Sequence, residues 1–252
     1  MEGPLGPSAR ARRPPTPGLA ALHARMLACT RCVDAGHLAA ASVVLPEPVP
    51  SRVVLVGQAP GRREVASRRP FSGRSGRQLF RWLAQAGCGD EAAARRAVYL
   101  TSVTKCFPGP ARHGGGDRRP LPAEIALCAP FLDEQLRRLR PRLVLAVGQL
   151  ALARFLPGRP LEQLVGRGFD GAGVELDWPP RPDRPRPWIL PLPHPSGASR
   201  WLNQAANREL LALALERLGA LLAAERAPGP GSPPSPPAPP AVRSRGQGTP
   251  CS

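Results

Sequence analysis

The chain has 252 residues, enough for one sizeable α/β domain, and 42% of them are hydrophobic, enough to supply a core. Its 35 Lys and Arg residues against 18 Asp and Glu give a net charge of +17, which favours a polyanionic partner, although a GC-rich genome also produces arginine-rich chains. No run of 18 apolar residues occurs and the N-terminus lacks the apolar core of a secretory signal, so we expect a cytoplasmic protein without a membrane segment.

Both ends of the chain have compositions typical of disorder. Residues 1–17 and the tail from Ala227 are rich in Pro, Gly and Ser, with too little apolar surface to offset the entropy lost on ordering. We therefore expect one folded domain over 18–226, between a disordered basic N-terminus (1–17) and a disordered Pro-rich tail (227–252).

Short β-rich runs alternate with helical patterns between the two ends. The predicted elements, in chain order, are a helix over 19–28, a strand over 52–57, a helix over 76–86, a strand over 98–103, a helix over 122–139, a strand over 142–147, a helix over 149–155, a strand over 187–192 and a helix over 203–224. Apolar strands separated by helices predict a three-layer αβα sandwich around a mainly parallel four-stranded sheet. The Gly- and Pro-rich segments 108–120 and 168–186 are predicted to be surface loops.

The predicted parallel sheet indicates where a ligand would bind. In such sheets, ligands bind at the carboxyl ends of the strands. The turn that begins at Gly57, the segment after Leu100 and the loop that begins at Pro193 all lie at such ends. These three segments can therefore converge on one site.

Four of the six cysteines have positions that would suit a metal centre. Cys29 and Cys32 form a C-x2-C pair, Cys106 follows a predicted strand, and Cys128 lies in a predicted helix. Thiolates favour zinc or an iron-sulfur cluster. The spacing leaves open the alternative that Cys106 and Cys128 are ordinary buried hydrophobic residues.

Four motifs follow one another along the chain in a recognisable order. They are "GQAPGRREVASRRPFSGRSG" (57–76), "VTKC" (103–106) with the later "EIALCAPFL" (124–132), "RPRLVLAVGQLA" (140–151) and "LPHPSGASRWLN" (192–203). Together they resemble the uracil-DNA glycosylase superfamily, most closely its iron-sulfur-containing family 4 type. The likeness covers about residues 25–220.

The resemblance implies a function and a cofactor. It implies a DNA repair enzyme that hydrolyses the N-glycosidic bond of uracil or another deaminated base in DNA, and we expect this enzyme to be a monomer. It also implies that Cys29, Cys32, Cys106 and Cys128 bind a 4Fe-4S cluster. The alternative is a catalytically weak or inactive member of the superfamily that binds damaged DNA.

The resemblance also implies roles for individual residues around the flipped base. His194 would donate a hydrogen bond to the base oxygen where negative charge builds, Phe71 would stack on the base, and Ser102 would face the base edge. Backbone amides of the turn would approach the base closely, and the residues concerned are Gly57, Ala59, Pro60 and Gly61.

The loop after His194 is the predicted contact with the DNA backbone. Ser196 and Ser199 would contact phosphates, and Arg200 or Trp201 would enter the gap left by the flipped base. Trp201 has an equally weighted alternative as a hydrophobic anchor for the last helix.

Two positions depart from the family pattern. Gln58 stands where the family has Glu, so position 58 cannot supply a general base, and Glu64 is the nearest acidic residue in the motif. Ser102 stands where the uracil-reading relatives have Asn. Gln58 and Glu64 are therefore the candidates for positioning the catalytic water, and uracil specificity is left open.

Overall fold

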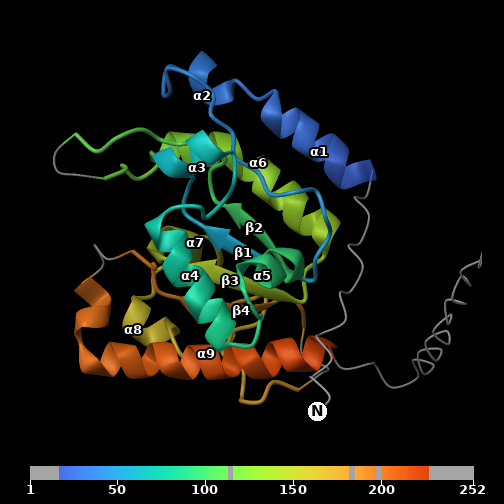
Figure 1. Ribbon diagram of the computed structural model, residues 1–252, viewed down its shortest axis with the longest axis vertical. Helices are drawn as coiled ribbons and strands as arrows, with labels where there is room; N and C mark the ends of the chain where they lie inside the picture. Colours follow the sequence, from blue (N-terminus) through green and yellow to red (C-terminus); the bar gives the residue numbers. More distant parts are fainter. Residues whose placement is uncertain (1–16, 113–115, 182–184, 197–199, 227–252) are drawn as a thin grey trace, which may run out of the picture.

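A parallel sheet forms the centre of the molecule (Figure 1). The computed structural model describes residues 17–112, 116–181, 185–196 and 200–226. The strands are β1 (Val53–Gly57), β2 (Val98–Ser102), β3 (Leu143–Val147) and β4 (Trp188–Leu192). Their order in the sheet is β2-β1-β3-β4, and every neighbouring pair is parallel. The carboxyl ends of all four strands therefore lie at one edge.

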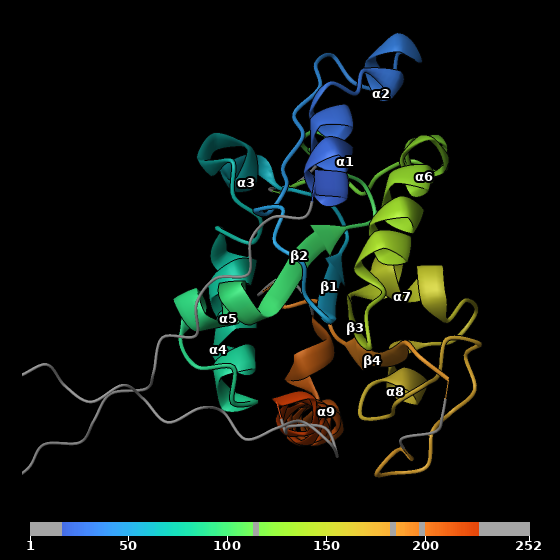
Figure 2. The same ribbon diagram turned by 90° about the vertical axis from the view of Figure 1, so that its right-hand side faces the viewer.

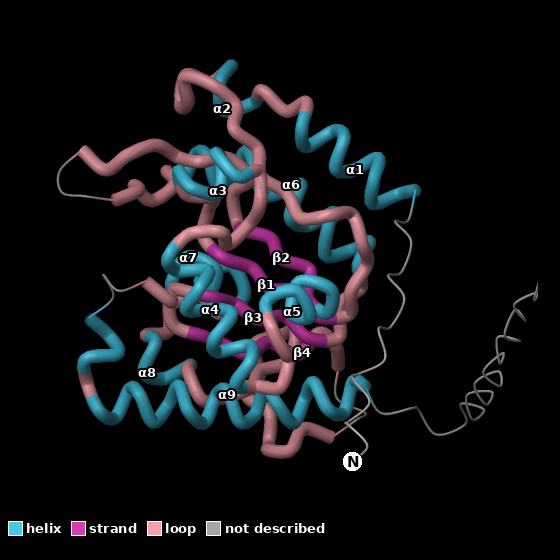
Figure 3. The backbone as a smooth tube through the Cα atoms, viewed as in Figure 1, coloured by secondary structure: helices cyan, strands magenta, loops and turns pink. Residues whose placement is uncertain are grey.

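Helices cover both faces of the sheet (Figures 2 and 3). In chain order they are α1 (Pro17–Leu27), α2 (Arg31–Asp34), α3 (Arg62–Ser67), α4 (Arg74–Gln85), α5 (Glu91–Ala97), α6 (Pro122–Leu139), α7 (Gln149–Phe155), α8 (Leu161–Leu164), the 3-10 turn η1 (Arg200–Asn203) and α9 (Ala205–Arg226). Figure 2 shows α4 and α5 on one side of the strands and α6 and α7 on the other. The predicted three-layer αβα sandwich is confirmed, and the sheet is parallel throughout.

Alternate residues of each strand enter two separate cores. Val53 and Leu55 pack with residues of α4 and α9, whereas Val54 and Val56 pack with residues of α1, α6 and α7. All five residues of β1 are buried, as are those of the other three strands. Burial on both faces explains why the strands read as nearly continuous apolar runs.

The predicted elements agree closely with the observed ones, apart from the shortest helices. Each strand is one residue shorter than predicted, and α6 and α7 have the predicted bounds. The sequence analysis missed α2, α3, α5, α8 and η1, which have between 4 and 7 residues. Helices of one or two turns show little of a hydrophobic period, and only α7, with 7 residues, was predicted among them.

The prediction that 168–186 is a surface loop is wrong in part. Phe169 is 1% exposed, and its backbone exchanges two hydrogen bonds with Ile189, so it pairs with the edge of the sheet. Leu176 is also buried. Both apolar side chains enter a core from a segment whose Gly and Pro content had indicated a loop.

The predicted disordered ends fall almost entirely outside the described residues. Helix α1 begins at Pro17, the last residue of the predicted N-terminal segment. Disorder of 1–16 and 227–252 stays a prediction. Among the described residues, no helix is long and apolar enough to cross a membrane.

A chain of buried polar side chains connects α1 to the end of β2. His23 Nε2 lies 2.6 Å from the Tyr99 hydroxyl, which accepts a hydrogen bond from Gln135 Nε2 (2.7 Å). Gln135 Oε1 accepts from Thr101 Oγ1, and that hydroxyl accepts from Lys105 Nζ, each at 3.0 Å. Each of these buried polar groups therefore has a partner, as burial requires.

This polar chain predicts a pH dependence of stability. Burial, together with the positive charge of Lys105, lowers the pKa of His23 to about 4. An unfolded histidine titrates near 6.5, so the unfolded state takes up the proton first as the pH falls. We expect the unfolding free energy to fall by roughly 3 kcal/mol between pH 7 and pH 4 on account of this group.

Urea unfolding at both pH values tests this expectation. His23→Gln keeps a polar partner for Tyr99 and removes the titration, so its stability should depend less on pH by that amount. An identical pH dependence in the two proteins would contradict the role assigned to His23.

Candidate active site and cysteine pocket

The carboxyl edge of the sheet brings most of the predicted site residues together. Gly57 and Ser102 are partners in the register of β1 and β2. Gly148 follows β3, and its N–H donates to the carbonyl of Leu192, the last residue of β4 (2.9 Å). His194 lies two residues beyond Leu192. The three segments that were expected to converge therefore do so.

The turn after β1 is held against the residues after β2. The N–H of Val103 donates to the Gly57 carbonyl (2.9 Å), and the N–H of Thr104 donates to the Gln58 carbonyl (3.2 Å). Pro60 is buried, whereas Gln58 and Gly61 are half-buried. Ala59 is likewise half-buried. The turn is thus fixed to the sheet edge while part of its surface remains accessible.

The Phe71 ring lies against the end of β1. A Cβ atom on Gly57 would lie 2.7 Å from Phe71 Cζ, so only glycine lets the ring approach this closely. Phe71 has a φ of +54°, a left-handed conformation that is unfavourable for a bulky residue. Gly76 is also required, because a Cβ there would lie 1.8 Å from the Phe71 carbonyl oxygen.

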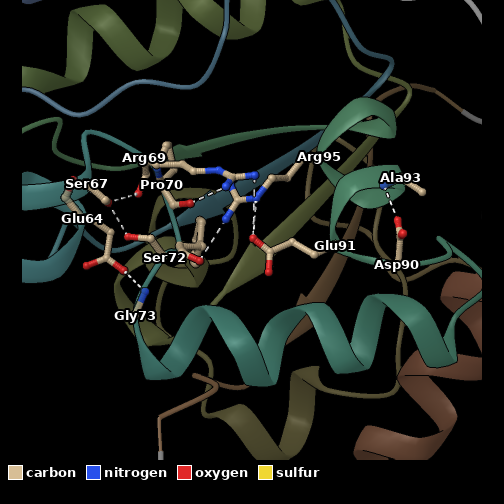
Figure 4. A network of polar contacts seen from close by, with 11 residues as sticks. Glu64, Ser67, Arg69, Pro70, Ser72, Gly73, Asp90, Glu91, Ala93 and Arg95 are labelled. Carbon is tan, nitrogen blue, oxygen red and sulfur yellow. Dashed lines mark hydrogen bonds and ion pairs between the residues drawn. The ribbon is translucent and has the colours of Figure 1, made fainter.

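Arg95 on α5 holds the Phe71 backbone in this conformation (Figure 4). Its guanidinium donates to the carbonyls of Pro70 (2.8 Å) and Phe71 (3.2 Å). The same group pairs with Glu91 at 2.8 Å and lies 4.4 Å from the centre of the Phe80 ring. The sequence analysis missed Arg95, and its only signal was the i,i+4 spacing from Glu91.

Glu64 joins the two ends of the segment between the turn and α4 by hydrogen bonds. One carboxylate oxygen accepts from the N–H of Gly61 (3.1 Å) and the other from the N–H of Gly73 (2.9 Å). Figure 4 shows the Glu64 side chain directed at Gly73. Both oxygens thus serve the backbone, and a catalytic role for Glu64 stays a prediction.

His194 packs over the backbone after β3. A Cβ on Gly148 would lie 3.1 Å from His194 Cδ2, and Gly148 has a φ of +81°. The N–H of Ser196 donates to His194 Nδ1 (3.3 Å). Burial lowers the pKa of His194, and the positive charge of Arg119 lowers it further. The ring is therefore neutral at pH 7, with its proton on Nε2.

The other residues predicted to contact the base or the DNA differ in exposure. Ser102 is 8% exposed and its hydroxyl donates to the Thr104 carbonyl (2.7 Å), so the hydroxyl hydrogen points into the protein. Arg200 is exposed, and Ser199 lies outside the described residues.

Trp201 packs against the core, and its Nε1 donates to Glu162 (2.7 Å). This arrangement supports the interpretation of Trp201 as an anchor for the last helix over its role as a wedge.

The four predicted ligand cysteines line one pocket. Cys29 follows α1, Cys32 lies in α2, Cys106 follows β2 and Cys128 lies in α6. Apolar side chains such as Met26 and Phe131 form much of the remaining wall, and Arg31, Lys105 and Glu124 also line it. All four thiols are free of disulfides. Residues far apart in the sequence therefore present four sulfur donors to one space.

Burial in the pocket disfavours free thiolates. Burial raises the pKa of Cys106 to about 11, and burial also raises the pKa values of Cys32 and Cys128. A bound metal offsets this cost because it stabilises the thiolates. The N–H of Lys105 donates to Cys128 Sγ (3.3 Å). Among the described residues, no three His, Cys, Asp or Glu side chains are close enough to share one metal ion.

Comparisons with known proteins agree with this geometry. The family model for the uracil DNA glycosylase superfamily matches residues 46–219. A type-4 uracil-DNA glycosylase from Thermotoga maritima is 32% identical over 76% of this chain and 86% of its own length. Type-4 enzymes from Archaeoglobus fulgidus and Pyrobaculum aerophilum are 36% and 33% identical, over 42% and 50% of this chain and 47% and 62% of their own lengths.

The matched region contains the whole sheet, the turn after β1 and the His194 loop. The match with the Thermotoga maritima protein extends over most of both chains. The chain therefore belongs to the uracil DNA glycosylase superfamily.

Proposed function

We propose that the chain is a DNA N-glycosylase that hydrolyses the N-glycosidic bond of uracil or another deaminated base in DNA. The observation that carries the proposal is the pair of rings at one sheet edge, Phe71 over Gly57 and His194 over Gly148. The first provides a surface on which a flipped base stacks, and the second provides a hydrogen-bond donor. The type-4 relatives are named for this activity.

His194 has the protonation state that the leaving base requires. Because Nδ1 accepts from the Ser196 N–H, the neutral ring donates through Nε2. A neutral donor stabilises the anion that forms on the base as the glycosidic bond breaks. Backbone amides of the turn from Gly57 to Gly61 would contribute further donors to the same base.

An arginine-rich surface beside the turn would attract the DNA. Six arginines between positions 62 and 77 are exposed, namely Arg62, Arg63, Arg68, Arg69, Arg74 and Arg77. Exposed guanidinium groups bind phosphates and give an affinity that falls with salt. We propose that Ser196 and Arg200 add contacts at the His194 loop and that the protein acts as a monomer.

A second candidate function is binding of damaged DNA with little or no catalysis. Gln58 supplies no carboxylate, and the Ser102 hydroxyl is directed at Thr104 rather than outward. Both observations favour this alternative. It predicts binding to uracil-containing DNA without release of the base.

A single-turnover assay separates the two functions. We expect excision of a deaminated base from oligonucleotides carrying uracil, hypoxanthine or xanthine, tested as single strands and in duplexes. His194→Ala should slow the step about a hundredfold or more, because the donor to the leaving base is lost. Its DNA affinity should remain close to that of the wild type. Binding by the wild type without excision of any of these bases would establish the second function.

We further propose that the cysteine pocket holds a 4Fe-4S cluster through Cys29, Cys32, Cys106 and Cys128. Support comes from the four thiols around one pocket and from the hydrogen bond to Cys128 Sγ. Four-iron clusters are bound by four cysteine thiolates, each on a different iron, so their sulfurs lie further apart than around one zinc ion. The cluster would be structural, tying α1, α2, α6 and the segment after β2 together.

Metal analysis tests the cluster. The protein purified without oxygen should contain about four iron atoms per chain together with sulfide. Cys106→Ser should reduce the iron content and the soluble yield. Cys251→Ser is the matched control and should change neither. Stoichiometric zinc without iron would refute this proposal.

Arg95 should act as a positioning residue for Phe71. Arg95→Met removes the donors to the Pro70 and Phe71 carbonyls, so we expect the unfolding free energy to fall by about 2 kcal/mol. The DNA concentration needed for half-maximal excision should rise, because the stacking ring is no longer held. Arg96→Met is the control, since Arg96 is exposed on the same helix. Equal behaviour of the two variants would exclude this role.

A further inference from the structure

In the segment 108–120, predicted to be a surface loop, the described residues 108–112 and 116–120 form two antiparallel arms of a hairpin beside α3 (Figure 1). Its arms are joined by hydrogen bonds from the Ala111 N–H to the Gly116 carbonyl and from the Arg118 N–H to the Gly109 carbonyl, both 3.0 Å. The Arg118 guanidinium also donates to both oxygens of Glu124, at 2.8 and 2.5 Å.

Glu124 in turn is fixed in the first turn of α6. It is 3% exposed and accepts a hydrogen bond from the Leu121 N–H (2.6 Å). The arm that contains residues 116–119 is therefore held by a bidentate ion pair to a buried carboxylate, a geometrically specific kind of contact.

This arm lies against the turn after β1. The Asp117 Oδ2 atom lies 2.7 Å from the position that a Cβ on Gly61 would occupy. Glu64 Oε2 lies at the same distance from that position. Glycine at position 61 thus makes room for two carboxylates, one from α3 and one from the hairpin.

The two carboxylates differ in their partners. Both Glu64 oxygens accept backbone N–H groups, from Gly61 and Gly73. Asp117 is exposed, and its carboxylate has no hydrogen bond or ion pair with the other described residues. Asp117 is therefore the carboxylate that can accept a hydrogen bond from a water molecule at the turn.

The same arm also carries a charge that acts on the candidate site. The positive charge of Arg119, two positions beyond Asp117, lowers the pKa of His194.

We propose that Asp117 supplies, from the hairpin, the catalytic carboxylate that position 58 lacks. This proposal rests on the glycosylase function proposed above. In the reaction the bond between C1′ and the base nitrogen breaks, and the base leaves with the bonding electrons, stabilised by His194. A water oxygen then bonds to C1′, and the proton that the water loses passes to Asp117. Before that transfer, the negative charge of Asp117 stabilises the cationic sugar.

Two variants and a control test the proposal in single-turnover excision assays on the full chain. Asp117→Asn should slow excision about a hundredfold, the usual scale for losing a general base, while DNA affinity is not weakened. Asp177→Asn, an exposed control, should have the wild-type rate. Gln58→Glu in the Asp117→Asn background should recover at least tenfold of the lost rate, because it returns a carboxylate to the turn.

Each outcome has a distinct meaning. A wild-type rate for Asp117→Asn would overturn the role of Asp117 and leave the glycosylase function intact. A slow variant that Gln58→Glu does not rescue, together with weaker DNA binding or lower stability, would show that Asp117 only supports the fold. Absence of excision by the wild type on any deaminated base would overturn the glycosylase function itself.

Discussion

Two glycines at the ends of neighbouring strands determine the shape of the candidate site. Gly57 ends β1 and Gly148 follows β3, and each lies beneath an aromatic ring. A Cβ would come 2.7 Å from the Phe71 ring at the first position and 3.1 Å from the His194 ring at the second. Because β1 and β3 are hydrogen-bonded neighbours, both rings meet the same sheet edge. The positions of both rings thus depend on the lack of a side chain at Gly57 and Gly148.

Lys105 links this edge to the cysteine pocket. It is the only lysine in the chain and is 2% exposed. Its ammonium donates to Thr101 Oγ1 and to the Ser102 carbonyl, while its backbone N–H donates to Cys128 Sγ. Burying an ammonium is tolerated only with such partners. A structural cluster in the pocket would therefore also hold the end of β2, at the candidate site.

The sequence was most informative where a pattern is local. Buried parallel strands produce apolar runs, so all four were predicted to within one residue, and the amphipathic pattern of α6 gave both of its ends. Contacts between distant residues have no such pattern. Arg95 reaches the carbonyl of Phe71 across 24 positions, and Asp117 reaches Gly61 from a segment whose glycines indicated only a loop. The hydrogen bond from Trp201 to Glu162 likewise joins residues 39 positions apart, and it favours the anchor over the wedge, two interpretations that the sequence weighted equally.

A glycosylase site needs positive charge to attract DNA at long range and negative charge to stabilise the cationic sugar at short range. Exposed arginines attract DNA phosphates over a Debye length of about 8–10 Å, and salt weakens this attraction. A cationic sugar needs negative charge in direct contact, in a region from which water and salt are largely excluded. In a chain with a net charge of +17, a carboxylate at the turn has arginines close to it in sequence, such as Arg62 and Arg63, that could pair with it.

Two acidic residues near the turn are held in place by groups other than these arginines. Glu64 is held by two backbone amides, and Asp117 is carried on an arm whose base is tied by Arg118 to the buried Glu124. The arm is thus anchored by a residue other than the one that faces the turn. Such an arrangement leaves the Asp117 oxygens available, and it explains how a chain with glutamine at position 58 could still present a negative charge to the sugar.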